Sequence, residues 1–265
     1  MSDIKKPTIL LSNDDGIHAK GINSIIPLLR EYGNLVVVAP EQGQSAQSHA
    51  ITIKEPLFLK KIHEEEGLTK YVCSGTSVDC VKMALNNILS EKPDYVVSGI
   101  NHGTNAAISV IYSGTMAAAL EAHIHGIPSI GFSVVDYSED ADFTASVHFA
   151  RIILDQLFPS RESGFCFNVN VPKGPIDSIH GIKVGRQARS SWVESFEKRT
   201  NPAKKDYYWL TGHFINFEPD AVDTDDWALR NGYVSIVPVQ ADFTAHHQVS
   251  EYKHLETKVL NHSSK

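Results

Sequence analysis

Cysteine and long apolar runs are both scarce in this sequence, and each scarcity excludes a class of protein. The 265 residues include three cysteines, Cys73, Cys80 and Cys166, and no two of them form a Cys-x-x-Cys pair. An odd number of widely spaced cysteines fits neither a disulfide framework nor a cysteine-ligated zinc site. We therefore expect three reduced, mostly buried thiols. No apolar run approaches the roughly 20 residues of a membrane-spanning helix, so we expect no membrane association.

Positive charge is in deficit as well. The chain has 24 lysines and arginines against 31 aspartates and glutamates, which gives a formal net charge of −7 at pH 7. Such a chain lacks the basic surface that a long nucleic acid requires, so any nucleotide ligand should be small. Residues 1–7 contain no apolar core of the kind found in signal peptides. Together with the reduced thiols, this favours a cytoplasmic protein.

Short apolar runs alternate with segments of helical periodicity through most of the chain. The runs at residues 8–12, 35–39, 95–100 and 129–133 are apolar on both faces, which is typical of strands buried within a parallel sheet. Between the first two runs, residues 22–29 carry isoleucine and leucine at the spacing of one helix face. A helix that connects two buried strands indicates that the strands are parallel. We therefore predict an α/β fold with a mostly parallel sheet.

The pattern changes after residue 180, where helical periodicity fades and aromatic and turn residues become more frequent. We predict an α/β domain over residues 1–180 and a β-rich C-terminal extension over residues 181–265 that packs on the same domain. Such an extension can form an arm that exchanges between subunits. We interpret its tryptophans, Trp192, Trp209 and Trp227, as core or interface anchors rather than as residues that stack on a ligand.

Two adjacent carboxylates, Asp14 and Asp15, follow the first predicted strand. In an open α/β sheet, ligands bind at the carboxyl ends of the strands, so this pair lies where chemistry is expected. Neighbouring carboxylates repel each other unless a cation lies beside them. The sequence Asn-Asp-Asp-Gly is also typical of a turn. On these residues alone, a turn and a metal site are equally good interpretations.

Further oxygen-bearing side chains come after other predicted strands. Ser45 lies in the loop after the second strand, and Asn101 and Asn105 follow a later one. The carboxyl ends of parallel strands meet at one edge of a sheet, so these groups should lie near the two aspartates. Carboxylate, hydroxyl and amide oxygens suit a hard cation such as Mg²⁺, Mn²⁺ or Ca²⁺ better than they suit zinc. Together they favour the metal-site interpretation.

The segment Ser113-Gly114-Thr115 opens a predicted helix. Backbone N–H groups at such a helix start have little steric cover and suit a phosphate. An ordinary serine cap explains the same residues. A cation site with an anion site beside it indicates hydrolysis of a phosphate ester.

Three blocks of the chain carry a resemblance to a known family. They are ILLSNDDGI at residues 9–17, VSGIN at residues 97–101 and IYSGT at residues 111–115. These blocks resemble the signature blocks of the stationary-phase survival protein SurE family. Residues 39–52, 75–80 and 232–235 also match that family in order and spacing, so the resemblance covers nearly the whole chain.

The resemblance implies a fold, an assembly and an activity. It implies a Rossmann-like domain with helices on both faces of the sheet and a C-terminal arm swapped between subunits of a homodimer or homotetramer. It also implies a metal-dependent nucleotidase, which hydrolyses nucleoside 5′-monophosphates, and by extension 3′-monophosphates, to nucleoside and phosphate.

The resemblance also implies which residues bind the metal and the phosphate and which take part in catalysis. One divalent cation per subunit, Mg²⁺ or Mn²⁺, would be held by Asp14, Asp15, Ser45 and Asn101. The phosphate would be bound by Asn105, Ser113, Gly114 and Thr115. Asp14 or Asp15 would be the catalytic group that accepts a proton from the attacking water. The chain departs from the family pattern at residues 106–109, where Ala-Ala-Ile-Ser replaces Leu-Gly-x-Asp, so the geometry of this loop and the substrate preference stay open.

Two alternatives from other classes remain at this point. One is a metal-dependent deacetylase with an Asp-Asp motif, whose zinc would need histidine ligands. His18 and His102 lie near the right strand ends, although we interpret both as polar loop residues. The other alternative is a nucleotide sensor that uses the same pocket for binding without turnover.

Overall fold

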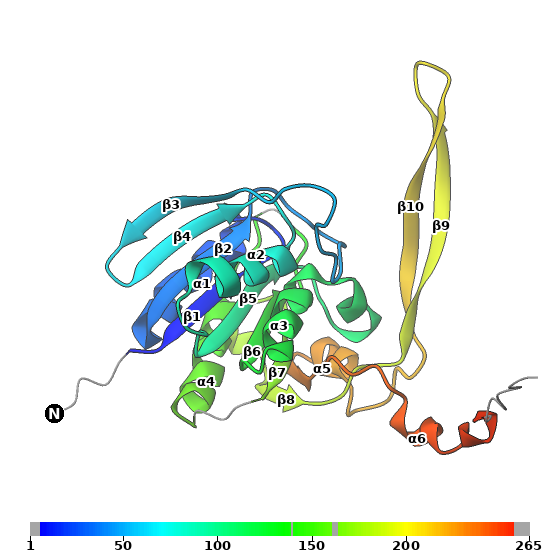
Figure 1. Ribbon diagram of the computed structural model, residues 1–265. Helices are drawn as coiled ribbons and strands as arrows, with labels where there is room; N and C mark the ends of the chain where they lie inside the picture. Colours follow the sequence, from blue (N-terminus) through cyan, green and yellow to red (C-terminus); the bar gives the residue numbers. More distant parts are fainter. Residues whose placement is uncertain (1–5, 139, 161–163, 257–265) are drawn as a thin grey trace, which may run out of the picture.

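The computed structural model describes residues 6–138, 140–160 and 164–256. Within these residues a nine-stranded sheet forms the centre of the molecule (Figure 1). Its strands, in their order across the sheet, are β3 (Leu59–Glu65), β4 (Leu68–Cys73), β2 (Asn34–Pro40), β1 (Thr8–Ser12), β5 (Tyr95–His102), β6 (Ser129–Val134), β7 (Cys166–Val171), β11 (Val234–Pro238) and β8 (Ile182–Val184).

Helices cover both faces of this sheet. Helices α1 (Lys20–Tyr32) and α4 (Thr144–Ser160) pack on one face, and α2 (Ser77–Met83) and α3 (Gly114–Ile124) pack on the other. The remaining described helices and turns are α5 (Asp225–Arg230), α6 (His246–Val249), η1 (Ala84–Ile88), η2 (Ala107–Tyr112), η3 (Ile176–Ser178) and η4 (Lys253–Leu255); of these, α6 lies away from the sheet (Figure 1). Among the described residues, none of these helices combines the length and the apolar character that a bilayer crossing requires.

The strand pairing is mostly parallel, as predicted. Leu11 of β1 pairs with Val37 of β2 on one side and with Val97 of β5 on the other, both in parallel register. Parallel pairing continues through β6 and β7 on one side and through β4 on the other. Within the described sheet, only the pairs β3–β4 and β7–β11 are antiparallel. The predicted α/β fold, with helices on both faces of a mostly parallel sheet, is confirmed.

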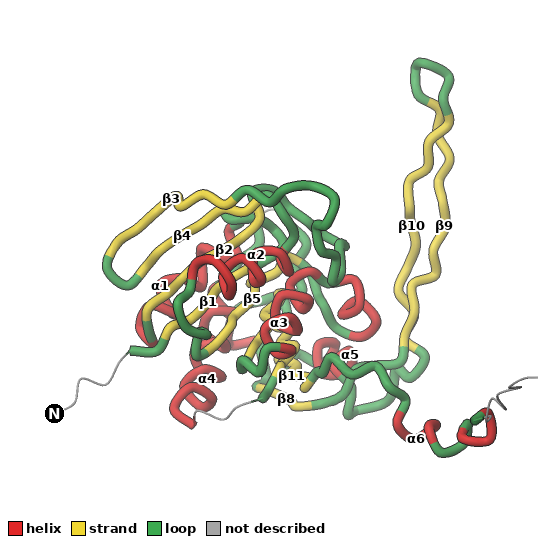
Figure 2. The backbone as a smooth tube through the Cα atoms, viewed as in Figure 1, coloured by secondary structure: helices red, strands yellow, loops and turns green. Residues whose placement is uncertain are grey.

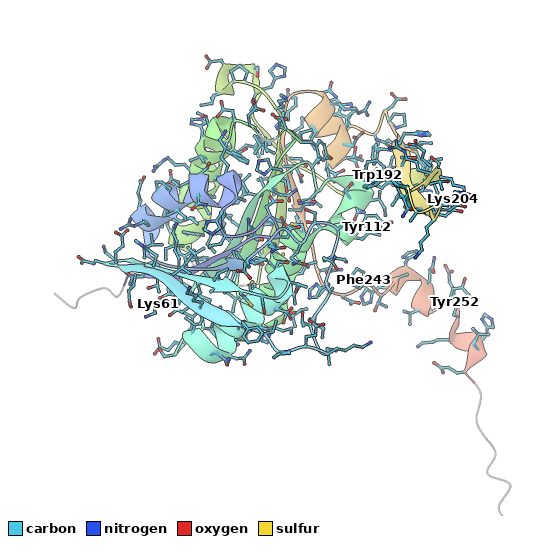
Figure 3. The ribbon with its side chains drawn as sticks, turned by 90° about the horizontal axis from the view of Figure 1, so that it is seen from above. Lys61, Tyr112, Trp192, Lys204, Phe243 and Tyr252 are labelled. Atoms are coloured by element: carbon cyan, nitrogen blue, oxygen red, sulfur yellow. The ribbon has the colours of Figure 1, made fainter. Side chains whose placement is uncertain are left out.

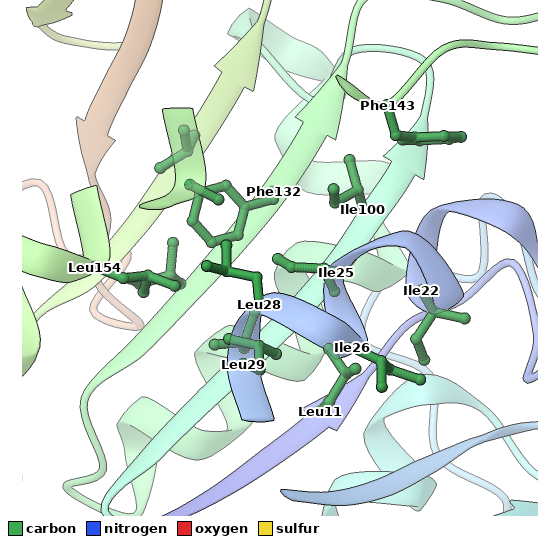
Figure 4. Packing of buried hydrophobic residues seen from close by; sticks show 14 of the residues in the cluster. Leu11, Ile22, Ile25, Ile26, Leu28, Leu29, Ile100, Phe132, Phe143 and Leu154 are labelled. Carbon is green, nitrogen blue, oxygen red and sulfur yellow. The ribbon is translucent and has the colours of Figure 1, made fainter. Parts of the chain in front are cut away.

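Successive residues of the central strand enter opposite cores, because side chains alternate between the two faces of a strand. Leu11 packs in a core beneath α1 and α4, together with residues such as Leu29 and Phe132 (Figure 4). Leu10 packs in the opposite core, beneath α2 and α3, beside Ala118. Both faces of β1 are therefore buried in apolar cores, which explains the two-sided apolar pattern of residues 8–12.

The C-terminal region has two parts. Residues 182–184 and 234–238 form β8 and β11, which extend the main sheet beyond β7. Between them, β9 (Ser190–Thr200) and β10 (Asp206–Asn216) pair antiparallel as a long hairpin that stands away from the sheet (Figures 1 and 2). The β-rich character of this region is as predicted. The division of the chain at residue 181, and an exchange of the hairpin between subunits, stay predictions.

The hairpin exposes many large apolar side chains. Phe196, Tyr208, Trp209 and Leu210 are each more than half exposed. An isolated two-stranded hairpin is marginally stable in water, and large exposed apolar patches mark interaction surfaces.

All three cysteines are free and buried, as expected from their spacing.

Candidate active site

The carboxyl ends of β1, β2 and β5 meet at one edge of the sheet because the three strands are adjacent and parallel. A cleft of about 580 Å³ opens at this edge. Five of the eight predicted site residues line it, namely Asp14, Ser45, Asn101, Asn105 and Ser113. The other three, Asp15, Gly114 and Thr115, lie behind or beside this lining. The tertiary fold thus brings together groups that are far apart in the sequence.

Asp14 is the most buried carboxylate of the site, with 3% of its surface exposed. The hydroxyl of Thr115 donates a hydrogen bond to Asp14 Oδ1. Burial raises the pKa of Asp14 to about 6, and the neighbouring Asp15 raises it as well, while the bond from Thr115 works in the opposite direction. A buried carboxylate of this kind is stabilised in its charged form by a cation placed next to it.

The absence of a side chain at Gly114 lets the Asp14 carboxylate pack directly against the start of α3. A Cβ atom at position 114 would lie 2.7 Å from Asp14 Cβ and 2.8 Å from Asp14 Oδ2. Any larger residue would therefore displace the Asp14 side chain. The preceding Ser113 caps α3, because its Oγ accepts a hydrogen bond from the backbone N–H of Met116 at 3.0 Å. The serine-cap interpretation is confirmed, and phosphate binding by this segment stays a prediction.

Asp15 is oriented by His102. The backbone N–H of His102 donates to Asp15 Oδ2 at 3.2 Å, and the ring Nδ1 of the same residue lies 3.5 Å from that oxygen. The interpretation of His102 as a loop residue is wrong, because it is the last residue of β5. Its ring also packs edge-on against Phe143, with 4.9 Å between ring centroids. In the sequence, its position directly after Asn101 indicated that His102 lies close to the site.

Ser45 lies in an exposed loop that is nevertheless tied to the site. The backbone N–H of Gln44 donates to the carbonyl oxygen of Asp14 at 2.7 Å. Further along the loop, Ser48 donates from its backbone to Tyr112 and from its hydroxyl to the carbonyl oxygen of Ile111. These bonds hold the loop over the carboxyl edge, so that Ser45 lines the cleft although its side chain is exposed.

The two asparagines are buried and oriented by hydrogen bonds. Asn101 Nδ2 donates to the carbonyl oxygens of His102 and Gly103, which leaves its Oδ1 facing the hydroxyl of Thr115 at 3.3 Å. The amide oxygen of Asn101 therefore lies on the Asp14 side of the cleft. Asn105 Nδ2 donates to Ser133 Oγ at 2.8 Å.

The segment that departs from the family pattern adopts an unusual backbone. Ala107 has a φ of 53°, in the left-handed region that favours glycine. Its N–H donates to the buried carboxylate of Asp225 at 2.7 Å. Ser109, at the position of the missing acid, lines the cleft. Asp225, which also accepts from the N–H of Ala188, was not identified as a site-supporting residue from the sequence.

Aromatic side chains form the outer wall of the cleft. They are Tyr112 from η2, Tyr137 from the loop after β6 and Trp192 from the hairpin, with Leu210 beside them. Figure 3 labels Tyr112 and Trp192, which reach this region from different elements. Trp192 lines the cleft. Its role as an interface anchor stays a prediction.

The donor set fits a hard divalent cation. Asp14, Asp15, Ser45 and Asn101 offer carboxylate, hydroxyl and amide oxygens, which are the ligands that Mg²⁺ and Mn²⁺ prefer. In the part of the chain that the structure describes, no three histidine, cysteine, aspartate or glutamate side chains come close enough together to hold a metal ion. The histidine-ligated zinc site of a deacetylase therefore has no support in the described residues.

Comparison with known proteins identifies the family. A family model described as survival protein SurE matches residues 9–194. A protein of Flavobacterium psychrophilum, named 5′-nucleotidase SurE, is 54% identical over 248 residues, which cover 93% of this chain and 96% of that protein. A protein of the same name from Flavobacterium johnsoniae is 53% identical and covers 97% and 98% of the two chains.

A solved structure agrees with these sequence matches. The crystal structure of the SurE protein from Aquifex aeolicus is 36% identical in sequence, has a TM-score of 0.80, and covers 95% of this chain and all of that one. The resemblance noted in the sequence is confirmed, and the chain belongs to the SurE survival protein family.

Proposed function

We propose that this protein is a divalent-metal-dependent 5′-nucleotidase, which hydrolyses nucleoside monophosphates to nucleoside and phosphate. The name 5′-nucleotidase of relatives that are more than 50% identical over nearly their whole length supports the activity. The observation that carries the proposal is the convergence of Asp14, Asn101 and the start of α3 at one cleft. A cation site and an anion site thereby adjoin, as phosphate-ester hydrolysis requires.

The cation would be held by Asp14, Asp15, Ser45 and Asn101, one ion per subunit. Mg²⁺ and Mn²⁺ are the candidates, since all four side chains offer oxygen. When bound, such a cation neutralises charge on the phosphate and lowers the pKa of a water molecule beside it. The burial of the Asp14 carboxylate supports this assignment, because a buried negative charge is stabilised by an adjacent cation.

The phosphate would be bound by Asn105 and by the start of α3. The first N–H groups of a helix have no partner within the helix, and the helix dipole favours negative charge at that end. Ser113 lines the cleft at this point. Gly114 and Thr115 would contribute backbone N–H groups, while the Thr115 hydroxyl orients Asp14.

Asp14 or Asp15 would accept the proton of the attacking water. In each carboxylate one oxygen is not used by the hydrogen bond with Thr115 or His102.

The nucleoside would lie against the aromatic wall of the cleft. The cleft volume of about 580 Å³ is within the range of small-molecule sites. Tyr112, Tyr137 and Trp192 offer flat surfaces on which any base can stack. A polar inner end and an aromatic outer end match the two ends of a nucleoside monophosphate.

The assembly would be a homodimer or homotetramer that forms through the β9–β10 hairpin. The exposed apolar side chains of this hairpin support the proposal, because they are otherwise left in water. Light scattering of the intact protein tests it. A monomer at micromolar concentration would contradict it.

A substrate panel tests the activity. The purified protein is treated with EDTA, dialysed, and assayed for phosphate release from 5′- and 3′-mononucleotides with and without Mg²⁺ or Mn²⁺. We expect release from 5′-monophosphates that stops with EDTA and returns with metal; the 3′-monophosphates decide whether the activity extends to them. Nucleotide binding without turnover would favour the sensor, and turnover of acetylated sugars would favour the deacetylase.

A further inference from the structure

Two asparagines are buried in the middle of the sheet at a place where apolar residues are the rule. Asn168 and Asn170 belong to β7, where Asn168 is 2% exposed and Asn170 is fully buried. Being two residues apart, they point to the same face of the strand. Burying an amide without hydrogen-bond partners is unfavourable, so such residues need a role for their polar groups.

Both amides bind the segment that carries Asn105. Asn170 Oδ1 accepts from the backbone N–H of Asn105 at 2.8 Å and from the hydroxyl of Thr104 at 3.1 Å. Asn168 Nδ2 donates to the carbonyl oxygen of Asn105 at 2.8 Å. The two amides are linked, because Asn170 Nδ2 donates to Asn168 Oδ1 at 2.8 Å.

The side chain of Asn105 is fixed from the neighbouring strand. Ser133 of β6, which accepts from Asn105 Nδ2 at 2.8 Å, lies opposite Asn170 in the parallel register of β6 and β7. The backbone N–H, the backbone carbonyl and the side-chain amide of Asn105 are thus all held by buried groups of two adjacent strands. A rigid strand pair therefore determines how Asn105 is presented to the cleft that it lines.

We propose that Asn168 and Asn170 are positioning residues, which set the Asn105 amide for binding the phosphate group of the substrate. This inference rests on the proposed function, in which Asn105 binds phosphate. Neither asparagine is among the residues that line the cleft, so both act through Asn105. A side chain that is already fixed at the phosphate position loses little conformational entropy when it binds the phosphate.

The test is a double-mutant cycle with Asn105→Ala and Asn170→Leu. Leucine resembles asparagine in size but removes the bonds to the N–H of Asn105 and to Asn168. We expect Asn170→Leu to raise both KM for a 5′-mononucleotide and the inhibition constant of inorganic phosphate by about 10-fold or more. In the Asn105→Ala background, the same substitution should have almost no further effect, since residues acting through one another are not additive.

Ser235→Ala is the matched control. Ser235 is fully buried on β11 and lies opposite Asn170 in the register, and its hydroxyl has no hydrogen-bond partner among the described residues. The control should leave KM and phosphate inhibition unchanged. If Asn170→Leu does not fold, Asn168→Leu replaces it, because that variant still removes the bond to the Asn105 carbonyl.

The outcomes separate this inference from the proposed function. If the parent protein does not release phosphate, or if Asn105→Ala is fully active, the proposed role of Asn105 is wrong. If Asn105→Ala is impaired but Asn170→Leu is not, or if the two effects simply add, the positioning role alone is wrong. Effects that do not add, in folded variants with Tm values near that of the parent, support the positioning role.

Discussion

The hydroxyl of Thr115 donates a hydrogen bond to the carboxylate of Asp14, although 101 residues separate the two in the chain. This bond joins the first turn of α3 to the end of β1. The proposed phosphate-binding helix start and the proposed cation ligand are therefore held in one fixed arrangement. Because Asp14 is buried, the bond from Thr115 also moderates the rise in its pKa.

Replacing Thr115 should weaken cation binding. Thr115→Val keeps the shape of the side chain but removes the donor, so the buried charge of Asp14 becomes less favourable. We expect the Kd for Mn²⁺ to rise roughly 10-fold, which corresponds to about 1.4 kcal/mol. Isothermal titration measures the Kd. Thr115→Ser keeps the hydroxyl and is the control; unchanged affinity in Thr115→Val would contradict the role of this bond.

Replacing Asp15 should abolish metal-stimulated catalysis and leave the fold intact. Asp15→Asn keeps the size of the side chain but removes the negative charge from the proposed cation site. We expect phosphate release to fall by about 100-fold or more. Asp177→Asn, which changes an exposed carboxylate on η3, is the control for loss of one charge. Full activity of Asp15→Asn, with a native circular dichroism spectrum, would rule out the proposed cation site.

Replacing Trp192 should discriminate between substrates with and without a base. Trp192→Ala should lower kcat/KM for nucleoside monophosphates about 10-fold, because base stacking on an aromatic side chain contributes roughly 1–3 kcal/mol. Ribose 5-phosphate, which has no base, should be hydrolysed as before. Trp209→Ala is the control, since Trp209 is an exposed hairpin tryptophan that is not part of the cleft lining. Equal losses for both substrates would contradict base stacking on Trp192.

Replacing Ala107 by glycine should stabilise the protein. Ala107 adopts a left-handed backbone, which is unfavourable by about 1 kcal/mol for a residue with a Cβ atom. Glycine removes that strain, but it also makes the unfolded chain more flexible, which opposes folding. We therefore expect the free energy of unfolding to rise by roughly 0.5 kcal/mol. Urea denaturation measures it. Ala150→Gly, within α4, should instead destabilise by about 1 kcal/mol. A loss of stability in both variants would contradict the assigned conformation.

Glu121 should make stability depend on pH. This buried carboxylate of α3 contacts Lys82 at 2.6 Å, His49 at 3.0 Å and His125 at 3.2 Å. Burial alone would raise the pKa of Glu121, but hydrogen bonds from Lys82 and His49 lower it below its usual value. A lowered carboxyl pKa contributes stability above the unfolded-state value of 4.5, and that stability is lost as the pH falls through the folded-state value.

Glu121→Gln tests this dependence. We expect a loss of about 2 kcal/mol at pH 7, since the three partners are partly exposed and solvent weakens their attraction. The difference from the parent protein should shrink below pH 4.5, where the unfolded state is protonated as well. Urea denaturation at several pH values measures it, with the exposed Glu55→Gln as control. A difference that does not vary with pH would contradict the role of the charge.

The sequence alone determined the fold class and the strand ends that matter. The apolar run at residues 8–12 is buried on both faces in the sheet, so its periodicity sufficed to identify a central strand. Asp14 and Asp15 had to lie at its carboxyl end because they come directly after the strand in the chain. The spacing of apolar residues is enough to predict strands and helices, because it depends only on neighbours in the chain.

Only the tertiary structure decided which other residues bind and orient the groups at these strand ends. Asn170 binds Asn105 across 65 residues, and Asp225 binds Ala107 across 118. No periodicity relates such pairs, because their meeting depends on the order of strands in the sheet and not on local spacing. For the same reason, the sequence indicated only that residues 181–265 are rich in strands. It did not indicate that β8 and β11 extend the main sheet, or that the hairpin brings Trp192 to the cleft.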